Sequence, residues 1–229
     1  MTRMHHGFFF LILISLVAGI GGTAFAASSQ GEISYLEGQV TIDNVPAAIG
    51  DRVPLGATVR TEAVSLCEIV FREKNILRLG DQTTFVFNPS NLQVGSDLQK
   101  GALTLVLKNL VNGAAGDHSF FVRTPTAAAG VRGTSFFVKV QDANTTYICM
   151  CNGVATVDLG ADPAALDLES SHHVAYWLST DDRGASSVIK APLLYHTDGD
   201  MEGLAAKIGV SIDWSSVDRR SADPSSTGR

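Results

Sequence analysis

The sequence has little charge and no concentration of positive charge. Charged residues make up 17% of the 229 residues, and 17 Lys and Arg against 23 Asp and Glu give a formal net charge of −6. The basic residues are scattered along the chain. Because binding to nucleic acid needs a clustered basic surface, the sequence predicts no nucleic-acid partner.

Recognisable catalytic motifs are also missing. The sequence has no Gly-x-Ser-x-Gly elbow, no Walker loop and no convincing pair of carboxylates, which are the marks of nucleophilic, nucleotide and glycoside chemistry. A thiol enzyme using Cys149 or Cys151 with His173 is conceivable, but no oxyanion-forming glycine turn or orienting Asn accompanies the pair. We therefore expect a protein that is not an enzyme and that acts by binding, scaffolding or sensing.

One long apolar run is present, and it lies at the N-terminus. Met1 to His6 carries Arg3, Gly7 to Ile20 is apolar, and Ala24-Phe25-Ala26 fits the small-x-small rule for signal cleavage. The run is shorter than the about 20 residues that a spanning helix needs. Residues 1–26 are therefore predicted to be a cleaved signal peptide rather than a membrane anchor. The expected product is periplasmic or secreted and has no integral membrane segment.

After the N-terminal run, short strand-like runs are separated by turns about every 8–12 residues. This pattern predicts an all-β fold of stacked short antiparallel strands, as a sandwich or solenoid-like domain, over residues 27–160. Residues 161–214 are expected to form a small C-terminal α/β appendage with one helix near 200–208, capped by Asp198 or Asp200 and followed by a short strand. Residues 215–229 are rich in Ser, Asp, Arg and Pro and are predicted to be a flexible tail.

Residues 123–138 read Arg-Thr-Pro-Thr-Ala-Ala-Ala-Gly-Val-Arg-Gly-Thr-Ser-Phe-Phe-Val and join two strand-like runs without an acid, His or Cys. This stretch resembles the signature of the FecR domain, a bacterial periplasmic β-domain. The resemblance extends over roughly 31–159 through weaker matches in order: Gly38-Gln-Val40, Gly50-Asp51, Leu77-Arg-Leu-Gly80, Gly101-Ala-Leu103 and Asn152-Gly-Val154. It implies an all-β, non-enzymatic domain in the bacterial envelope.

A structural role is expected for the residues of this motif. Pro125 fixes φ, Gly130 and Gly133 permit positive φ, and Arg132 can donate hydrogen bonds to carbonyls that a tight crossing leaves unpaired. The alternative is an anion-binding turn, which lacks a helix N-terminus here. The motif residues are Thr124, Pro125, Gly130, Arg132, Gly133 and Thr134.

The best-known proteins that this chain resembles pass a signal from an outer-membrane receptor to a cytoplasmic sigma factor through an N-terminal cytoplasmic domain and a membrane helix. Only a few residues precede the apolar run here. We therefore expect no sigma factor as partner, and expect an envelope protein or polymer instead.

Three cysteines and a group of histidines give the sharpest hypothesis about chemistry. Cys149 and Cys151 are two residues apart on a predicted strand, so both side chains point to one face. Thiolate and imidazole ligands suit a transition metal ion such as zinc or copper. His172, His173 and His196 are the candidate partners, with Asp198 or Asp200 to orient His196. The alternative function is thus a metal-binding or metal-sensing periplasmic protein.

Two other interpretations of the cysteines stay open on the sequence alone. Cysteine is commonly a small buried core residue, and the histidines would then lie in a surface loop. A disulfide is the third interpretation, either to Cys67 or between Cys149 and Cys151. The second bridge is awkward, because Cα atoms two residues apart on a strand lie about 6.5–7 Å apart.

Overall fold

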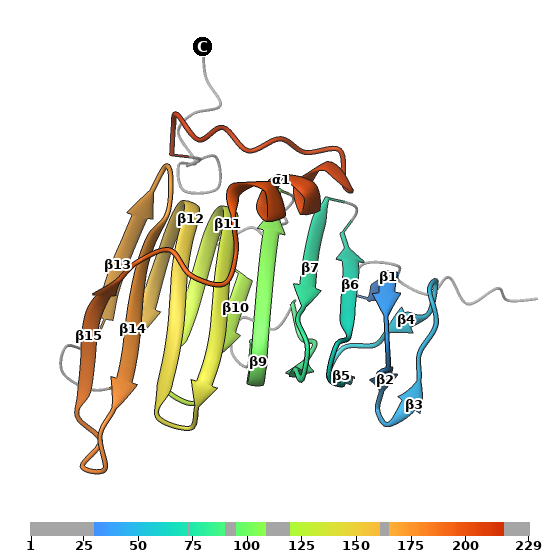
Figure 1. Cartoon of the computed structure of the whole chain (residues 1–229), viewed down its shortest axis with the longest axis horizontal. Coiled ribbons are helices and arrows are strands. Elements are labelled where there is room, and N and C mark those ends of the chain that lie inside the picture. Colours follow the sequence, from blue (N-terminus) through green and yellow to red (C-terminus); the bar gives the residue numbers. More distant parts are fainter. Residues whose placement is uncertain (1–29, 73, 90–94, 109–119, 161–164, 218–229) are drawn as a thin grey trace, which may run out of the picture.

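The structure is a computed structural model that describes residues 30–72, 74–89, 95–108, 120–160 and 165–217, and the backbone alone at Gly133 and Thr134 (Figure 1). The predicted signal peptide and all but the first three residues of the predicted flexible tail lie outside these ranges.

The described residues form fifteen strands and one helix. Strands hold 57% of the described residues, so the fold is all-β in class, as predicted, with a small helix near its C-terminal end. The first eight strands are β1 (Gly31–Glu37), β2 (Val40–Ile42), β3 (Val45–Pro46), β4 (Arg52–Val53), β5 (Thr58–Thr61), β6 (Leu66–Phe71), β7 (Asn75–Leu79) and β8 (Thr84–Val86). The remaining elements are β9 (Ser96–Leu107), β10 (Phe120–Arg123), β11 (Ala128–Asp142), β12 (Thr145–Asp158), β13 (Ala165–Ser170), β14 (Val174–Thr180), β15 (Ser186–Ala191) and α1 (Asp198–Ala206).

Neighbouring strands pair in the order β15-β14-β12-β11-β10-β9-β7-β6-β1-β4, and β2, β3, β5, β8 and β13 attach beside this path. All pairings are antiparallel except that of β9 with β10. The prediction of stacked antiparallel strands is confirmed.

Two long strands, β11 and β12, fold the sheet into layers. They hold 15 and 14 residues, where short strands were expected, and their register shifts between Arg132 and Ser135. On one side of this irregularity β11 pairs with β9, and on the other side it pairs with β10. Bulges of this kind bend a strand. Figure 1 accordingly shows β10 and β13 behind the row formed by β14, β12, β11 and β9.

The main core fills the space between the layers, where Phe136, Val138, Ile148 and Met150 are buried with side chains from β5, β8 and β9. The alternate residues of β11 and β12 point to the opposite face of the sheet. That face is also apolar, and the C-terminal residues cover it. α1 contacts β7 and β9, and the chain before it crosses in front of β14 and β12 (Figure 1).

Helix α1 forms where the sequence predicted a helix, with Met201, Leu204 and Ala205 buried against the sheet. Its N-cap is Thr197 and not Asp198 or Asp200, because the Thr197 side chain accepts from the Asp200 backbone while Asp200 accepts in return. The short strand expected after α1 does not form among the described residues, and β13 forms within the segment predicted as the C-terminal appendage. The β13 residues extend the sheet by pairing with β12.

The 123–138 motif is a hairpin turn followed by a strand. The Thr124 backbone N–H donates to the Ala127 carbonyl at 2.8 Å, and Pro125 occupies the turn between β10 and β11. Gly130 does not adopt positive φ as predicted; a Cβ there would lie 2.9 Å from the Phe121 ring, so glycine is needed for space. The side chain of Thr134 lies outside what the structure describes. The predicted carbonyl bonds of Arg132 stay a prediction.

Candidate metal centre

Cys149 and Cys151 lie on the covered face of β12, where Cys149 pairs with Phe137 of β11 and Ala175 of β14. Both side chains point to this one face, as the two-residue period of a strand requires, and both residues have no exposed surface. The structure has all three cysteines as free thiols, with Cys67 buried in the main core. The predicted alternatives that invoke a disulfide are therefore not what the structure shows.

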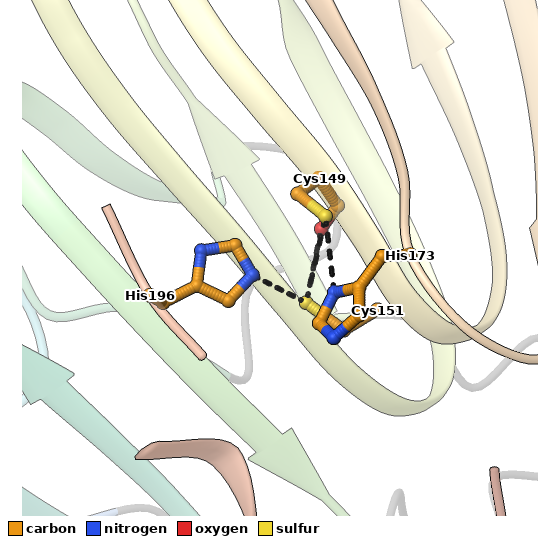
Figure 2. Close-up of side chains that lie close together, drawn as sticks. All are labelled: Cys149, Cys151, His173 and His196. Atoms are coloured by element: carbon orange, nitrogen blue, oxygen red, sulfur yellow. Dashed lines mark hydrogen bonds between the residues drawn. The ribbon is translucent and has the colours of Figure 1, made fainter. Parts of the chain in front are cut away.

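Two histidines from different parts of the chain approach these sulfur atoms (Figure 2). His173 ends the turn before β14 with φ of 51°, and its backbone N–H donates to the Cys151 carbonyl at 3.0 Å. His196 lies between β15 and α1, and its ring stacks on Phe137 with centroids 4.5 Å apart. Contacts within the protein alone thus hold both rings against the sheet.

The four side chains present two sulfur and two nitrogen atoms to a common point. Sγ of Cys149 lies 3.8 Å from Sγ of Cys151 and 3.5 Å from Nδ1 of His173, and Sγ of Cys151 lies 3.2 Å from Nε2 of His196. All four atoms lie within 4.8 Å of one another. A tetrahedral zinc ion, with bonds of about 2.3 Å to sulfur and about 2.0 Å to nitrogen, spaces its sulfur atoms about 3.8 Å apart. The donor set and its spacing fit such an ion.

The remaining nitrogen of each ring is occupied by a partner that orients it. Nε2 of His173 lies 2.7 Å from Oδ1 of Asp198, and Nδ1 of His196 lies 2.9 Å from the Leu194 carbonyl oxygen. If these nitrogens carry the protons, Nδ1 of His173 and Nε2 of His196 are left as acceptors facing the sulfur atoms. Metal-bound histidines usually have such a partner. Asp198 was predicted to orient His196, and the structure places it on His173 instead.

His172 does not reach the sulfur atoms. Its Nε2 lies 2.9 Å from Oδ2 of Asp198, and about half of its side chain is exposed. His172, His173 and Asp198 therefore form a second group on the outer side of the first. Of the five predicted ligands, the structure brings together Cys149, Cys151, His173 and His196.

The two thiols have opposite tendencies to ionise. The pKa of Cys149 is lowered to about 4, first by the hydrogen bond from Cys151 and then by those from His173 and His196. Burial raises the pKa of Cys151 well above its ordinary value, and the negative charge on Cys149 raises it further. The pair thus holds one thiolate in the absence of a cation, and a thiolate is the form in which cysteine binds a metal.

The pKa of His173 follows from two opposed effects. Burial lowers it, but the hydrogen bonds with Cys149 and Asp198 outweigh burial and raise the pKa overall. The raised pKa means that the protonated ring of His173 is favoured beside the Cys149 thiolate and Asp198 more than in a free histidine.

Comparison with known proteins identifies the domain that supplies the two cysteines of this cluster. The family model described as FecR protein matches residues 57–155. This part of the chain is a FecR domain. The match includes Cys149 and Cys151 but ends before His173 and His196, so two of the four candidate ligands lie beyond the matched FecR segment.

Two crystal structures of a candidate anti-sigma factor from Parabacteroides distasonis ATCC 8503, at 1.65 and 2.50 Å resolution, are similar to the chain. Each shares 15% sequence identity and has a TM-score of 0.45, over 58% of this chain and 59% of the other. The chain thus spans less than two thirds of the length of those structures. None of the curated proteins matches the sequence.

The FecR match suggests a sensing or regulatory module, and FecR proteins are envelope-associated. It also corrects one prediction. The expectation of no sigma factor is wrong, because the FecR match points to sigma-factor signalling pathways. That expectation rested on the few residues before the apolar run, and their number does not decide which pathway a FecR domain serves. No helix among the described residues is long and apolar enough to cross a membrane.

Proposed function

We propose that this protein is a metal-responsive regulatory module of the bacterial envelope, in which one ion of the zinc class binds to Cys149, Cys151, His173 and His196. The FecR domain supplies the regulatory class, and sigma-factor signalling is the pathway that the family match favours. We further propose that the chain is exported through its N-terminal signal and has no catalytic activity.

The observation that carries the proposal is the convergence of two thiols and two imidazoles inside an apolar face. The donor atoms Sγ, Sγ, Nδ1 and Nε2 lie within 4.8 Å of one another, and both rings have their second nitrogen anchored. Tetrahedral sites with two sulfur and two nitrogen ligands are typical of zinc. Copper(I) shares the preference for thiolate, so the identity of the ion is an outcome of the experiment below.

A thiol hydrolase is the competing function, because Cys149, His173 and Asp198 follow one another in the order of nucleophile, base and orienting acid. A nucleophile must be reached by its substrate. Cys149 and Cys151 have no exposed surface, and the residues around them are closed by the C-terminal part of the chain. This burial favours a bound ion over a substrate.

The test is the metal content of the protein, purified without a polyhistidine tag and measured by elemental mass spectrometry together with a count of reactive thiols. We expect about one equivalent of metal, as a single four-ligand site requires. The Cys149→Ser and Cys151→Ser double variant should lose the metal. Replacing the metal with Co²⁺ should give the visible absorption of a tetrahedral site and a thiolate charge-transfer band.

His172 and His173 provide a matched pair of variants. His173→Ala should lower the affinity for the ion strongly, whereas His172→Ala should leave the stoichiometry unchanged, because His172 contacts Asp198 and the His173 ring but reaches neither sulfur atom. A folded protein that takes up no Zn²⁺ or Cu⁺ from solution would overturn the proposed function.

A further inference from the structure

The residues that close the candidate metal centre belong to one continuous piece of chain, residues 192–217, here called the C-terminal cover. It leaves β15, passes His196, forms α1 and returns along the end of the sheet (Figure 1). Among the described residues, its backbone-to-backbone hydrogen bonds join residues of the cover to one another, as in Met201 to Thr197 and Val210 to Ala205. The cover is therefore held to the sheet by side chains.

The candidate ligands are divided between the sheet and the cover. Cys149 and Cys151 come from β12 and His173 from the turn that enters β14, whereas His196 comes from the cover. Asp198, which anchors His173, is the first residue of α1 and also belongs to the cover. An ion bound by all four ligands thus joins the cover to the sheet directly.

The other polar ties between the cover and the sheet are made by Tyr147, Asn152 and Glu68. The Tyr147 hydroxyl donates to the Pro192 carbonyl and accepts from the Leu194 N–H, both at 3.0 Å. At the far end of α1, Lys207 contacts the buried Glu68 carboxylate at 2.6 Å. Asn152 of β12, next to Cys151, donates to the Asp213 and Ser216 carbonyls at 2.9 and 2.8 Å, and a bound ion would add a further polar connection beside this one.

Apolar contacts add to these ties, and they include the partly buried side chains of Leu194, Ile208, Val210, Ile212 and Trp214. Met201, Leu204 and Ala205 are buried against Ile76 and Val106 of the sheet and against the cysteine-bearing face. Burying a Leu or Met side chain contributes about 1.5–3 kcal/mol. A helix of nine residues is marginal on its own in water, so its docking is open to control by a single strong contact.

We propose that occupancy of the metal centre controls whether the C-terminal cover stays closed over the sheet. With the ion bound, His196 and Asp198 hold the cover shut. Without the ion the cover detaches more readily and exposes the apolar face that includes Phe137 and Tyr147. This inference rests on the proposed function, and it supplies the change of surface through which a regulatory module reports the presence of the ion.

Hydrogen exchange measured by mass spectrometry tests the inference on the whole protein. One sample is loaded with Zn²⁺ and the other is stripped with a chelator, and metal content is measured in both. Removal of the ion should speed exchange in peptides from 192–214 by roughly 5–150-fold, the usual size of coupling between linked sites. Peptides from β5 and β8, which lie away from the cover, are the internal control and should not change.

The outcomes separate this inference from the proposed function. If one ion binds but exchange in 192–214 is the same with and without it, the proposal that the ion controls the cover is wrong. The proposed metal centre would be unaffected by this result. If stripping speeds exchange equally in β5 and β8, the ion holds the whole fold and the cover is not a separate device. If no ion binds, the proposed function fails first.

Trp214 gives a second measurement that needs no change to a ligand. Its ring stacks on His173 with centroids 5.1 Å apart, and Trp177 is the other tryptophan of the chain. In a Trp177→Phe variant, the fluorescence of Trp214 reports on the cover alone. Addition of Zn²⁺ should shift its emission to shorter wavelength as the ring is held against His173. An emission that is independent of Zn²⁺ while the ion binds would count against the inference.

Discussion

Asp198 is the anchor of His173: Oδ1 of the carboxylate lies 2.7 Å from Nε2 of the ring, which leaves Nδ1 facing the Cys149 sulfur at 3.5 Å. The carboxylate comes from the first turn of α1 and the ring from the turn before β14, so the contact also joins the C-terminal cover to the sheet. Its exposed position makes it the most accessible point at which to perturb the centre without removing a ligand.

Asp198→Asn should lower the affinity for Zn²⁺ by about 10–100-fold, the usual effect of losing the partner of a metal-bound histidine. The stoichiometry at saturating metal should stay the same, because all four ligands remain. Competition with a chromophoric chelator measures both quantities. His172→Ala is the matched control, since it removes the other contact of Asp198 and keeps the contact with His173. Equal affinity in the Asp198→Asn variant and the unaltered protein would show that His173 needs no anchor.

The sequence was sufficient for some parts of this centre and not for others. The common face of Cys149 and Cys151 follows from the two-residue period of a strand. Which of His172 and His173 contacts the sulfur atoms could not be predicted in this way. It depends on the positive φ of 51° at His173, which turns one ring inward. The approach of His196 joins residues 45 apart in the chain and depends on how the cover crosses the sheet.

The fold, like the candidate metal centre, was predicted from the sequence only in part. The all-β class and the helix near residue 200 follow from local patterns, and the FecR resemblance was confirmed by the family match. The long strands β11 and β12 were not predicted, because the Gly-rich stretch looked like a crossing. In the structure Gly130 continues a strand under the Phe121 ring, a contact that no local pattern shows.

Gly101 should be the glycine that is most sensitive to substitution. It has φ of +88°, and a Cβ would collide with Oγ1 of Thr83 and lie 2.5 Å from its Cα. Gly101→Ala should therefore lower the free energy of unfolding by about 2–4 kcal/mol, from backbone strain and overpacking together. Gly50→Ala is the control: φ is +91°, but no atom lies within 4 Å, so about 1–2 kcal/mol is expected. Urea unfolding of the two variants would contradict this if their losses were equal.

The Cys67 thiol should not react with alkylating reagents in the folded protein. Burial raises its pKa from 9.0 to about 12, and the Glu68 carboxylate adds to the effect. Because the folded state keeps the proton longer than the unfolded state, this group stabilises the fold fully below about pH 9 and loses that contribution as the pH rises toward 12. Iodoacetamide at mildly alkaline pH should label Cys67 only after unfolding. Rapid labelling at this position in the native protein, located by peptide mass mapping, would contradict the assigned burial.

The buried Glu68 carboxylate gives the last prediction, because its two cationic partners are not equivalent. Arg78 donates through Nε and one terminal nitrogen to Oε1 at 3.0 and 2.9 Å and is 21% exposed, whereas Lys207 is 43% exposed. Arg78→Met should cost about 3 kcal/mol of stability, as expected when a buried charge loses its main partner. Lys207→Met should cost about 1 kcal/mol, since solvent already screens that side chain. Lys190→Met, on the exposed strand β15, should change stability by less than about 0.5 kcal/mol. Urea unfolding measures all three, and an Lys207→Met loss as large as that of Arg78→Met would show that the end of α1, rather than the sheet, neutralises Glu68.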